Sequence, residues 1–586
     1  MGDNYSDNLI TGSSSQQGFG RVNGNPRVYL LFVVFFLVFA VLILRAFFLQ
    51  VIKGEYFREL SNQNRTKTVA IHAARGVIFD RNGTPLVFNE PGYRIIKDNK
   101  TVLLNHDQAL PMLSNSNNQL EVDSLRRYPY ADEISHVLGY IGQISPEELK
   151  SPLFSEYKGN DLIGKEGIER SYEQRLKGID GRKLLEVDSS GKTLRSLGQD
   201  EPIAGVDVTL TLDLNLQQKT YEAMNNIKKG AAIVSKPNGE ILSLVSKPSF
   251  DPNLFTMGEN YKASTISAYT NIESVLADSQ NQPLLDRAIS GVYPPGSTFK
   301  IVVASAALKD KVIDENFTIL DTGILRVGAF SFSNWYFTGY GRTDGTVNVV
   351  KGIQRSNDIF FYKLAEALGV ESIAKGAASF FVGKQLGIDL LGEASGTLPS
   401  ESWKKENIGE GWYLGDTYHY GIGQGYLLTT PLQVNAWTQA IGNEGNLHSP
   451  HFLKEKADET IAKNLLDKKS FELIRQGMIE SCAKGGVAWP LFDFKVKNSK
   501  LKIDGKNFLE VKGASGSAET RQIVVACKTG TAEHGDTKGT PHAWITLFAP
   551  AYNPQIVVTV LAEESGEGSN VAAPIAKKIL EDYFSR

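Results

Sequence analysis

The feature that most restricts how this chain can fold is an uncharged apolar run near its N-terminus, Val28–Leu44. These 17 residues are rich in Phe, Val and Leu, and after Arg45 the apolar character continues through Ala46–Leu49. An α-helix rises about 1.5 Å per residue, so about 20 residues cross the hydrocarbon core of a bilayer. We therefore expect a membrane-spanning anchor over residues 28–49.

Two other interpretations of this run are weaker. A core helix of a soluble domain is rarely apolar on every side so close to a terminus. A cleaved signal peptide has a shorter apolar region of about 7 to 15 residues, and a small-residue cleavage site follows it. No such site follows Arg45, so we expect an uncleaved anchor. Residues 1–27, rich in Gly, Ser and Asn, are expected to be disordered.

Length, charge and cysteine content exclude several classes of protein. A chain of 586 residues is too long for one core and predicts about two to four domains. The formal net charge of -3 gives no reason to expect nucleic acid as a partner. Cys482 and Cys527 are the only cysteines, which excludes a disulfide framework and a Cys-rich metal site. One bridge and two free thiols both fit the sequence.

The first half of the remaining chain is a mixed region with one clear hairpin signal. Residues 80–83, Asp-Arg-Asn-Gly, separate two strand-like segments at 76–79 and 84–87. The segment 101–127 is polar and Asn-rich, and we expect it to be mainly loop.

The second half predicts an α+β domain. A hairpin is expected around Pro237-Asn238-Gly239, and a helical middle extends over roughly 297–480. Three strands and a closing amphipathic helix follow at 523–531, 542–549, 556–563 and 570–584. Strands at both ends of a helical segment predict an antiparallel sheet packed on a helical cluster.

The most informative stretch is 293–300, which reads Tyr-Pro-Pro-Gly-Ser-Thr-Phe-Lys. Its Pro and Gly residues predict a turn, and the apolar, Ala-rich segment 301–308 predicts a buried helix. Ser297 is thus expected at a helix N-terminus, where free N–H groups favour developing negative charge. Lys300 falls one turn away on the same face, and burial lowers a lysine pKa so that the neutral amine can accept the serine proton.

A second hydroxyl is offered by Ser356-Asn357-Asp358, which opens the helical segment 359–364. Ser356 is expected to relay a proton to the leaving amine, and Asp358 to hold Lys300 by a hydrogen bond. The same triplet also fits an ordinary helix N-cap by Ser356 or Asp358. Taken alone, the capping interpretation is the better one.

The third element is Lys528-Thr529-Gly530-Thr531, at the end of an apolar strand. Gly530 leaves space for a substrate to lie along the strand. Lys528, Thr529 and Thr531 offer a charge and hydroxyls to a substrate carboxylate. The N–H groups of Ser297 and Thr531 are expected to form an oxyanion hole.

Together, Ser-x-x-Lys, a Ser-containing triplet and Lys-Thr-Gly are the motif set of penicillin-binding proteins and β-lactamases. The chain resembles the class B penicillin-binding proteins from the anchor to the C-terminus. The motifs that carry this resemblance are Asn64-Arg65, 75–83, 127–130, 136–140, 164–169, 420–425, 430–433 and 542–544.

This resemblance implies a cytoplasmic tail (1–27), an anchor (28–49), a pedestal domain with a short head (50–203) and a transpeptidase domain (204–586). The pedestal is extended and mixed, and the last domain has the penicillin-binding/β-lactamase-like α+β fold. The catalytic domain is expected outside the cell membrane.

The resemblance also implies a reaction. Ser297 attacks the penultimate D-Ala carbonyl of a stem pentapeptide, D-Ala leaves, and an amine from a second stem resolves the acyl-enzyme. Lys300 is the implied base and Ser356 the relay, with Lys528, Thr529 and Thr531 as the carboxylate site. β-Lactams are expected to acylate Ser297, and the reaction needs no cofactor.

Asp358 stands where division-type relatives usually carry Asn, which indicates the elongation type. That type works with a SEDS-family glycosyltransferase and other proteins of the rod-shape complex. Some such relatives hold zinc near the Ser-x-Asp motif, but this chain has no His or Cys between Asp321 and Asp358. We therefore expect no metal there.

Three features depart from the family pattern. The head region, about 91–125, is short, and 495–522 is a polar insertion to which the sequence assigns no role. Cys527 stands where relatives usually carry Gly, and we expect it to crowd the active-site strand.

Three rival functions remain. A β-lactam sensor needs a signalling domain larger than the 27-residue tail, and a scaffold with a decayed site should have lost motif residues. A D,D-carboxypeptidase or β-lactamase of the same fold must activate water, and no separate general base is recognisable. After the non-catalytic and hydrolytic functions, a division-type transpeptidase is the third and nearest alternative.

Overall fold

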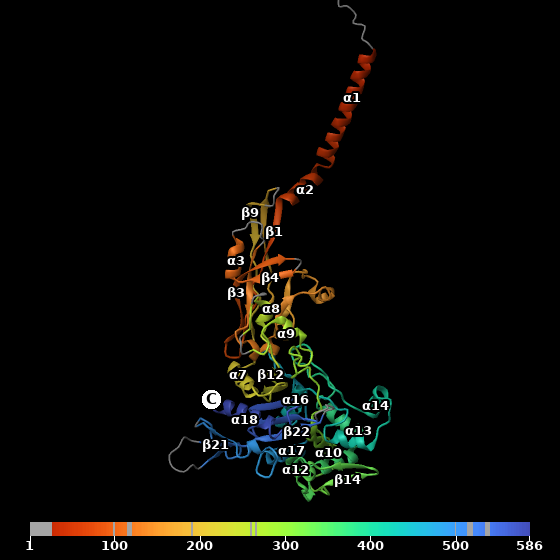
Figure 1. Ribbon diagram of the computed structural model, residues 1–586, viewed down its shortest axis with the longest axis vertical. Helices are drawn as coiled ribbons and strands as arrows, with labels where there is room; N and C mark the ends of the chain where they lie inside the picture. Colours follow the sequence, from red (N-terminus) through yellow and green to blue (C-terminus); the bar gives the residue numbers. More distant parts are fainter. Residues whose placement is uncertain are drawn as a thin grey trace, which may run out of the picture. The chain divides into compact units, whose positions relative to one another are not determined.

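The computed structural model describes residues 26–97, 100–113, 120–188, 192–257, 261–263, 267–498, 500–511, 520–533 and 539–586. The chain divides into two compact units. One comprises the residues up to 69 together with 182–200, and the other comprises 70–181 and 201–586 (Figure 1). The expected tail thus lies almost wholly outside the described residues, and the expected domain boundary at 203 stays a prediction.

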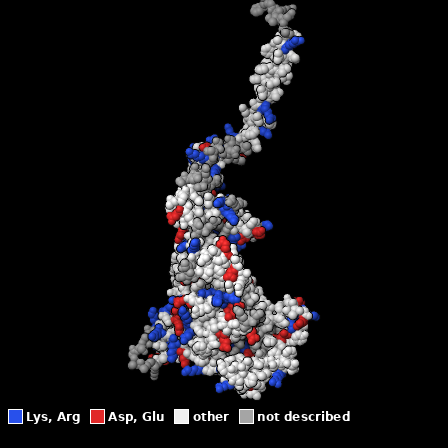
Figure 2. All heavy atoms as spheres, viewed as in Figure 1, with Lys and Arg blue, Asp and Glu red and all other residues white. Residues whose placement is uncertain are grey.

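The smaller unit begins with the long helix α1 (Pro26–Phe47), a π-turn at Phe48–Ile52 and α2 (Gly54–Arg65). None of the residues of α1 is buried, and Figure 2 shows Lys and Arg only near its ends. In the described part of the chain, 26–52 is the single helical segment long and apolar enough to cross a membrane. The expected apolar helix is therefore confirmed. The unit is completed by a sheet of order β1–β8–β9, with β1 (Thr66–Ile71), β8 (Gly181–Val187) and β9 (Thr193–Asp200).

The region 70–181 contains the first predicted hairpin. Ile78 of β2 (Ile78–Phe79) pairs with Val87 of β3 (Pro85–Lys97), and β3 also pairs with β4 (Lys100–Leu104) and β5 (Glu121–Arg127). With α3 (His106–Leu113), these strands make most of the described part of 101–127 regular. The expected loop is wrong here, because pairing with β3 orders the two strands of this locally polar segment.

Buried ion pairs hold this region together. The Glu169 carboxylate accepts hydrogen bonds from Arg75 Nε at 2.6 Å and Arg126 Nε at 2.7 Å. Burial alone raises the pKa of Glu169, but the two guanidinium groups outweigh burial and lower it. Arg75 and Glu169, which lie in two different motifs of the sequence, thus form a buried ion pair that supports the fold.

The main sheet of the larger unit has five antiparallel strands in the order β12–β11–β24–β23–β22. Their bounds are β11 (Gly230–Ser235), β12 (Ile241–Lys247), β22 (Ala526–Ala532), β23 (His542–Ala549) and β24 (Ile556–Ala562). The second predicted hairpin and the three C-terminal strands are confirmed. β22 is the last strand of this sheet, and among the described residues only β23 pairs with it.

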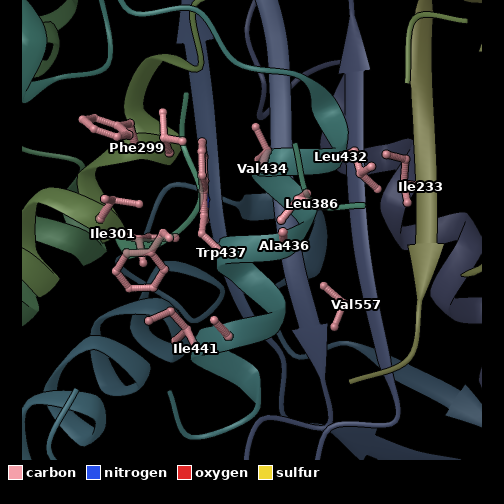
Figure 3. Packing of buried hydrophobic residues seen from close by; sticks show 14 of the residues in the cluster. Ile233, Phe299, Ile301, Leu386, Leu432, Val434, Ala436, Trp437, Ile441 and Val557 are labelled. Atoms are coloured by element: carbon pink, nitrogen blue, oxygen red, sulfur yellow. The ribbon is translucent and has the colours of Figure 1, made fainter. Parts of the chain in front are cut away.

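Successive side chains of the sheet enter two different cores, as the period of two in a strand requires. Ile233 packs in the core of the helical cluster, whereas Val234 packs in the core under the C-terminal helix. Figure 3 shows α16 between the sheet residues Ile233 and Val557 and the residues Phe299 and Ile301. The helices around the sheet are α7 (Leu214–Ala223), α10 (Lys300–Lys309), α12 (Val349–Arg355), α13 (Asp358–Ser379), α15 (Leu414–Gly421), α16 (Pro431–Gly442), α17 (Lys468–Ser481) and α18 (Ala572–Phe584).

The expected polar insertion forms a small sheet of its own in its described parts. Its strands β19 (Lys495–Lys497), β20 (Phe508–Glu510) and β21 (Thr520–Ile523) follow the order β19–β21–β20. Ile523, the first residue of the predicted strand at 523–531, is therefore the last residue of β21, and the strand of the main sheet begins at Ala526. Residues 499 and 512–519 of the insertion lie outside the described residues.

Candidate active site

Ser297 lies in a tight 3₁₀ turn, η5 (Gly296–Phe299), directly before α10. Gly296 has a φ of 54°, and a Cβ on it would meet the carbonyl oxygen of Thr531 at 2.7 Å. Its N–H donates to the carbonyl of Gly423 at 2.9 Å. A glycine is needed here because the turn lies between β22 and the Gly423 loop and has a left-handed backbone.

Lys300 is fully buried, and its amine has three oxygen neighbours. Its Nζ donates to Asp358 Oδ1 at 2.6 Å and to the Ser356 carbonyl at 2.8 Å, and it lies 3.3 Å from Ser356 Oγ. Burial lowers the pKa of Lys300, while the charge and hydrogen bond of Asp358 oppose this shift. A lysine with a lowered pKa is able to act as a general base.

Ser356 and Asp358 do not cap the helix that follows them. The N-cap of α13 is Asn357, whose side chain accepts a hydrogen bond from the N–H of Phe360 at 2.9 Å. Ser356 has a left-handed backbone with a φ of 52° between α12 and α13. The capping interpretation of Ser356 or Asp358 is therefore wrong, and both side chains turn to Lys300 instead.

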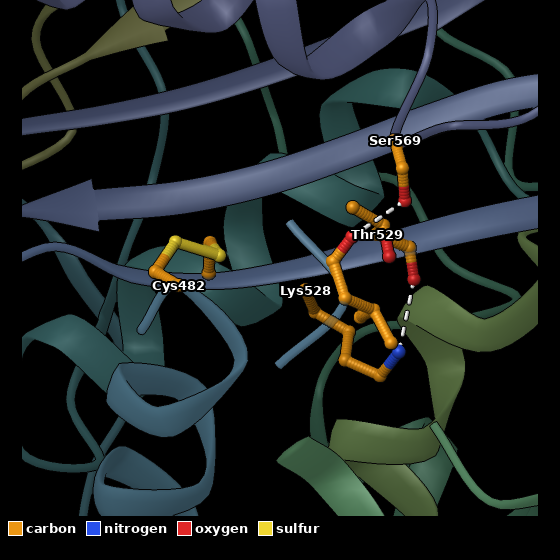
Figure 4. The surroundings of a disulfide bond; sticks show 6 residues. Cys482, Lys528, Thr529 and Ser569 are labelled. Carbon is orange, nitrogen blue, oxygen red and sulfur yellow. Dashed lines mark hydrogen bonds between the residues drawn. A yellow bond between two sulfur atoms is a disulfide. The ribbon is translucent and has the colours of Figure 1, made fainter. Parts of the chain in front are cut away.

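The Lys-Thr-Gly segment lies on the edge strand β22. Lys528 is fully buried, and its Nζ donates to the carbonyl of Thr529 at 2.9 Å (Figure 4). Burial, followed by the nearby charge of Lys300, lowers the pKa of Lys528 well below its usual range. Thr531 is exposed at the strand edge, whereas Thr529 is 7% exposed. Of these three side chains, that of Thr531 alone is exposed to solvent.

Gly530 is required for a reason that the sequence did not indicate. A Cβ on Gly530 would lie 3.0 Å from Thr298 Cγ2 and 3.1 Å from the carbonyl oxygen of Pro295. The missing side chain thus lets β22 approach η5 closely. We expected this space to lie along the strand, where a substrate binds. It faces η5 instead.

The two cysteines form a disulfide between the end of α17 and β22, with the Cα atoms 5.8 Å apart (Figure 4). The sequence left a bridge and two free thiols open, and the structure has the bridge. Cys527 is fully buried and packs in the core under the sheet. Since consecutive side chains of a strand point to opposite faces, Cys527 points away from Lys528. The expectation that Cys527 crowds the active-site strand is therefore wrong.

Sequence reasoning missed the polar residues behind the Ser356 triplet. The N–H of Trp335 donates to Asp358 Oδ2 at 3.0 Å, and the N–H of Asp358 donates to Asn334 Oδ1 at 3.1 Å. Asn334 follows the alternating segment Phe330–Ser333 without any motif of its own. In the described ranges, no group of three or more His, Cys, Asp or Glu residues lies where it could hold a metal ion.

An antiparallel sheet with helical cores and the three motifs around one serine defines the class of penicillin-recognising serine acyltransferases. A family model described as "Penicillin binding protein transpeptidase domain" matches residues 230–581, and "Penicillin-binding Protein dimerisation domain" matches 114–210. The chain belongs to the penicillin-binding protein transpeptidase family, in the class B branch that the sequence resembled.

Similar proteins cover almost the whole length of the chain. Peptidoglycan D,D-transpeptidase MrdA of Salmonella typhimurium is 32% identical, over 95% of this chain and 96% of the relative. MrdA of Escherichia coli K12 is 31% identical, over 95% and 93%.

Solved structures agree with this family. Helicobacter pylori PBP2 in complex with MreC has a TM-score of 0.72 at 28% identity, covering 89% of this chain and 99% of that one. Pseudomonas aeruginosa PBP2 in complex with WCK 5153 has a TM-score of 0.66 at 30% identity, covering 88% and 96%.

Proposed function

We propose that this chain is a peptidoglycan D,D-transpeptidase of cell-wall elongation, with Ser297 as its acylated nucleophile. The observation that carries the proposal is the bonding of Lys300. Its buried amine lies one helical turn from Ser297 and is held by both Ser356 and Asp358. This arrangement supplies a nucleophile, a base and a second hydroxyl at one point.

In the acylation step, Ser297 Oγ attacks the penultimate D-Ala carbonyl as Lys300 takes the serine proton. The new C–O bond replaces the peptide C–N bond, and the proton reaches the leaving amine through Ser356. D-Ala departs. In the second step, an amine of a neighbouring stem attacks the ester, its proton passes back by the same groups, and Ser297 is regenerated.

The edge strand β22 supports the binding of the donor stem as an added strand. Thr529 and Thr531 offer hydroxyls to the terminal carboxylate, and the amine of Lys528 lies behind them as a further hydrogen-bond donor. The N–H groups of Ser297 and Thr531 form the oxyanion hole. The close approach of Gly296 to the Thr531 carbonyl supports this pairing.

β-Lactams act on the same serine, because their strained amide presents an acylating carbonyl where the D-Ala–D-Ala bond lies. The resulting ester is resolved slowly when the antibiotic residue blocks the acceptor amine.

The setting of the reaction is the outer face of the cell membrane. The chain would cross the membrane once at 28–49 after a cytoplasmic tail (1–27), with a pedestal at 50–203 and the transpeptidase domain at 204–586. Its partners would be a SEDS-family glycosyltransferase and other rod-complex proteins. A solved complex of a similar chain with MreC, and another titled "Structural coordination of polymerization and crosslinking by a peptidoglycan synthase complex", support such assembly.

The direct test is labelling with a fluorescent penicillin, comparing the wild type with Ser297→Ala. We expect a covalent band that is lost in the variant, while the thermal unfolding temperature of the two proteins stays similar. A folded wild type that gives no band would contradict the proposal.

A donor pentapeptide assay then identifies the acceptor. Release of D-Ala that yields a cross-linked dimer when an amine acceptor is added is expected of a transpeptidase. Release without any dimer would indicate a D,D-carboxypeptidase instead.

A further inference from the structure

A buried polar network lies directly behind the Ser356–Asp358 triplet. Asp321 is its centre, because Asp321 Oδ2 accepts hydrogen bonds from Asn334 Nδ2 at 2.9 Å, Asn357 Nδ2 at 2.8 Å and the N–H of Asp344 at 2.8 Å. Asn334 and Asn357 are 0% exposed and Asp321 is 3% exposed. None of these side chains has a role in the reaction described above.

Asn334 connects this network to the catalytic pair. One end of its amide donates to Asp321, and the other end accepts the N–H of Asp358 at 3.1 Å. The next residue, Trp335, donates its N–H to Asp358 Oδ2 at 3.0 Å, while Asp358 Oδ1 faces Lys300 at 2.6 Å. Both the backbone and the carboxylate of Asp358 are thus fixed by the segment 334–335.

The charges around Asn334 come from several elements. Asp321 and Asp358 face it directly. Asp344 lies one hydrogen bond further and is paired with Arg355 at 2.9 Å, and Lys300 lies beyond Asp358. An amide at position 334 suits this place because it gives a donor to the acidic Asp321 and an acceptor to a backbone N–H, without adding charge.

We propose that Asn334 is a positioning residue of the transpeptidase, which, anchored on Asp321, fixes Asp358 so that one carboxylate oxygen faces Lys300. Lys300 is thereby held within reach of Ser356. The inference rests on the proposed acylation of Ser297 and adds a residue that none of the three motifs contains.

The first test compares Asn334→Ala with Asn253→Ala in the full-length protein. Asn253 is a matched control, because its buried amide also accepts a backbone N–H, that of Tyr128 at 2.9 Å, and donates to an aspartate, Asp251, at 2.7 Å. We expect the second-order rate of acylation by fluorescent penicillin to fall about a hundredfold in Asn334→Ala, since small misplacements of catalytic groups cost this much. Asn253→Ala should stay within about threefold of the wild type, because its hydrogen-bond partners Tyr128 and Asp251 are not residues of the proposed site.

The second test uses Asn334→Asp, which keeps the shape of the side chain. Two carboxyl groups at Asp321 and position 334 share one proton, and the apparent pKa of such a pair is raised. While the proton is present, the pair keeps the hydrogen bond to Asp321; once it is lost, two carboxylates repel each other. The ratio of the variant rate to the wild-type rate should therefore fall as the pH rises, whereas the ratio for Asn334→Ala should not depend on pH.

These results separate the inference from the proposed function. A wild type without acylation contradicts the proposed function itself. A wild type that reacts normally, with Asn334→Ala equal to Asn253→Ala, overturns the positioning role. A pH-independent ratio for Asn334→Asp also overturns it, because the link to Asp321 would then not be what supports Asp358.

Discussion

Lys300 shows how a single buried position controls the chemistry of the site. Burial lowers the pKa of its amine, and Asp358 raises that pKa, so the balance of the two sets the fraction of neutral base. The pKa of Lys300 is lowered overall. The rate of acylation should therefore rise with pH, and the midpoint of this rise should lie below the ordinary lysine pKa of about 10.4.

Asp358→Asn tests this balance. Removing the carboxylate charge takes away the influence that raises the pKa of Lys300, so the midpoint should move to lower pH. The maximal rate should fall about a hundredfold, because the lysine is held less firmly. The rate of acylation by fluorescent penicillin between pH 5 and 10 measures both effects.

Asp310→Asn is the control for this prediction, because Asp310 is exposed at the end of α10. Its pH profile should match the wild type. A midpoint in Asp358→Asn that moves upward or stays in place would show that Asp358 does not act on the base.

Gly296 is a second residue whose role is set by its backbone. Gly296→Ala has to adopt a left-handed conformation and also meets the Thr531 carbonyl, 2.7 Å from the new Cβ. The left-handed conformation alone costs about 1–2 kcal/mol for an L-residue. We expect a larger loss in the free energy of unfolding, together with slower acylation, measured by urea denaturation and penicillin labelling.

Gly83→Ala separates strain from crowding. Gly83 has a φ of 86°, but a Cβ there has no neighbour within 4 Å. The free energy of unfolding of this control should fall by about the strain energy alone, and its rate of acylation should stay normal. Equal acylation in both variants would mean that the approach of Gly296 to β22 is not needed for the site.

At the scale of elements, α17 joins two walls of the site. The Cys482–Cys527 bridge fastens the end of α17 to β22, one residue before Lys528. On its other side α17 packs against α12, where a Cβ on Gly477 would lie 2.8 Å from Ile353 Cβ. Since α12 ends at Arg355, directly before Ser356, α17 sets the spacing between the Ser356 triplet and the Lys-Thr-Gly strand.

Cys482→Ala/Cys527→Ala tests this role. The bridge closes a loop with a sequence separation of 45 residues, for which loop entropy predicts a stabilisation of about 4 kcal/mol. The double variant should unfold at lower denaturant and acylate more slowly, because β22 loses its covalent link to α17.

Reducing the wild type with dithiothreitol should reproduce both effects, and should not change the double variant further. If reduced wild type keeps its full stability and acylation rate, the bridge does not support the strand.

At the scale of the whole molecule, the contacts separate the anchor-bearing unit from the unit that carries the site. All residues of the proposed site lie within 201–586. Most residues of the two hydrophobic cores on either face of the main sheet lie there too. The catalytic chemistry therefore does not depend on the contacts of α1.

Deleting residues 1–52 should make the protein extractable without detergent and leave penicillin acylation within about threefold of the full chain, because the deleted segment belongs to a different compact unit from the site. The full chain should stay in the membrane fraction after an alkaline wash, since about 20 apolar residues hold a bilayer-spanning helix in place. Release of the full chain by that wash would contradict the anchor. Loss of acylation in the shortened protein would contradict the independence of the two units.

The sequence by itself determined the features that depend on local pattern. The anchor helix follows from one long uncharged run, and the hairpins at 80–83 and 237–239 follow from turn residues between apolar segments. The three motifs around Ser297 were also recognisable, because their residue types and order are specific.

Only the tertiary structure decided which residues meet. Lys300 and Asp358 are 58 residues apart, and the cysteines are separated by 45. Asn357 takes the capping role and leaves Ser356 and Asp358 to the lysine. Asn334 joins them without any motif. Such contacts depend on how distant elements pack, and the energy of each polar group depends on that burial, which a local pattern does not contain.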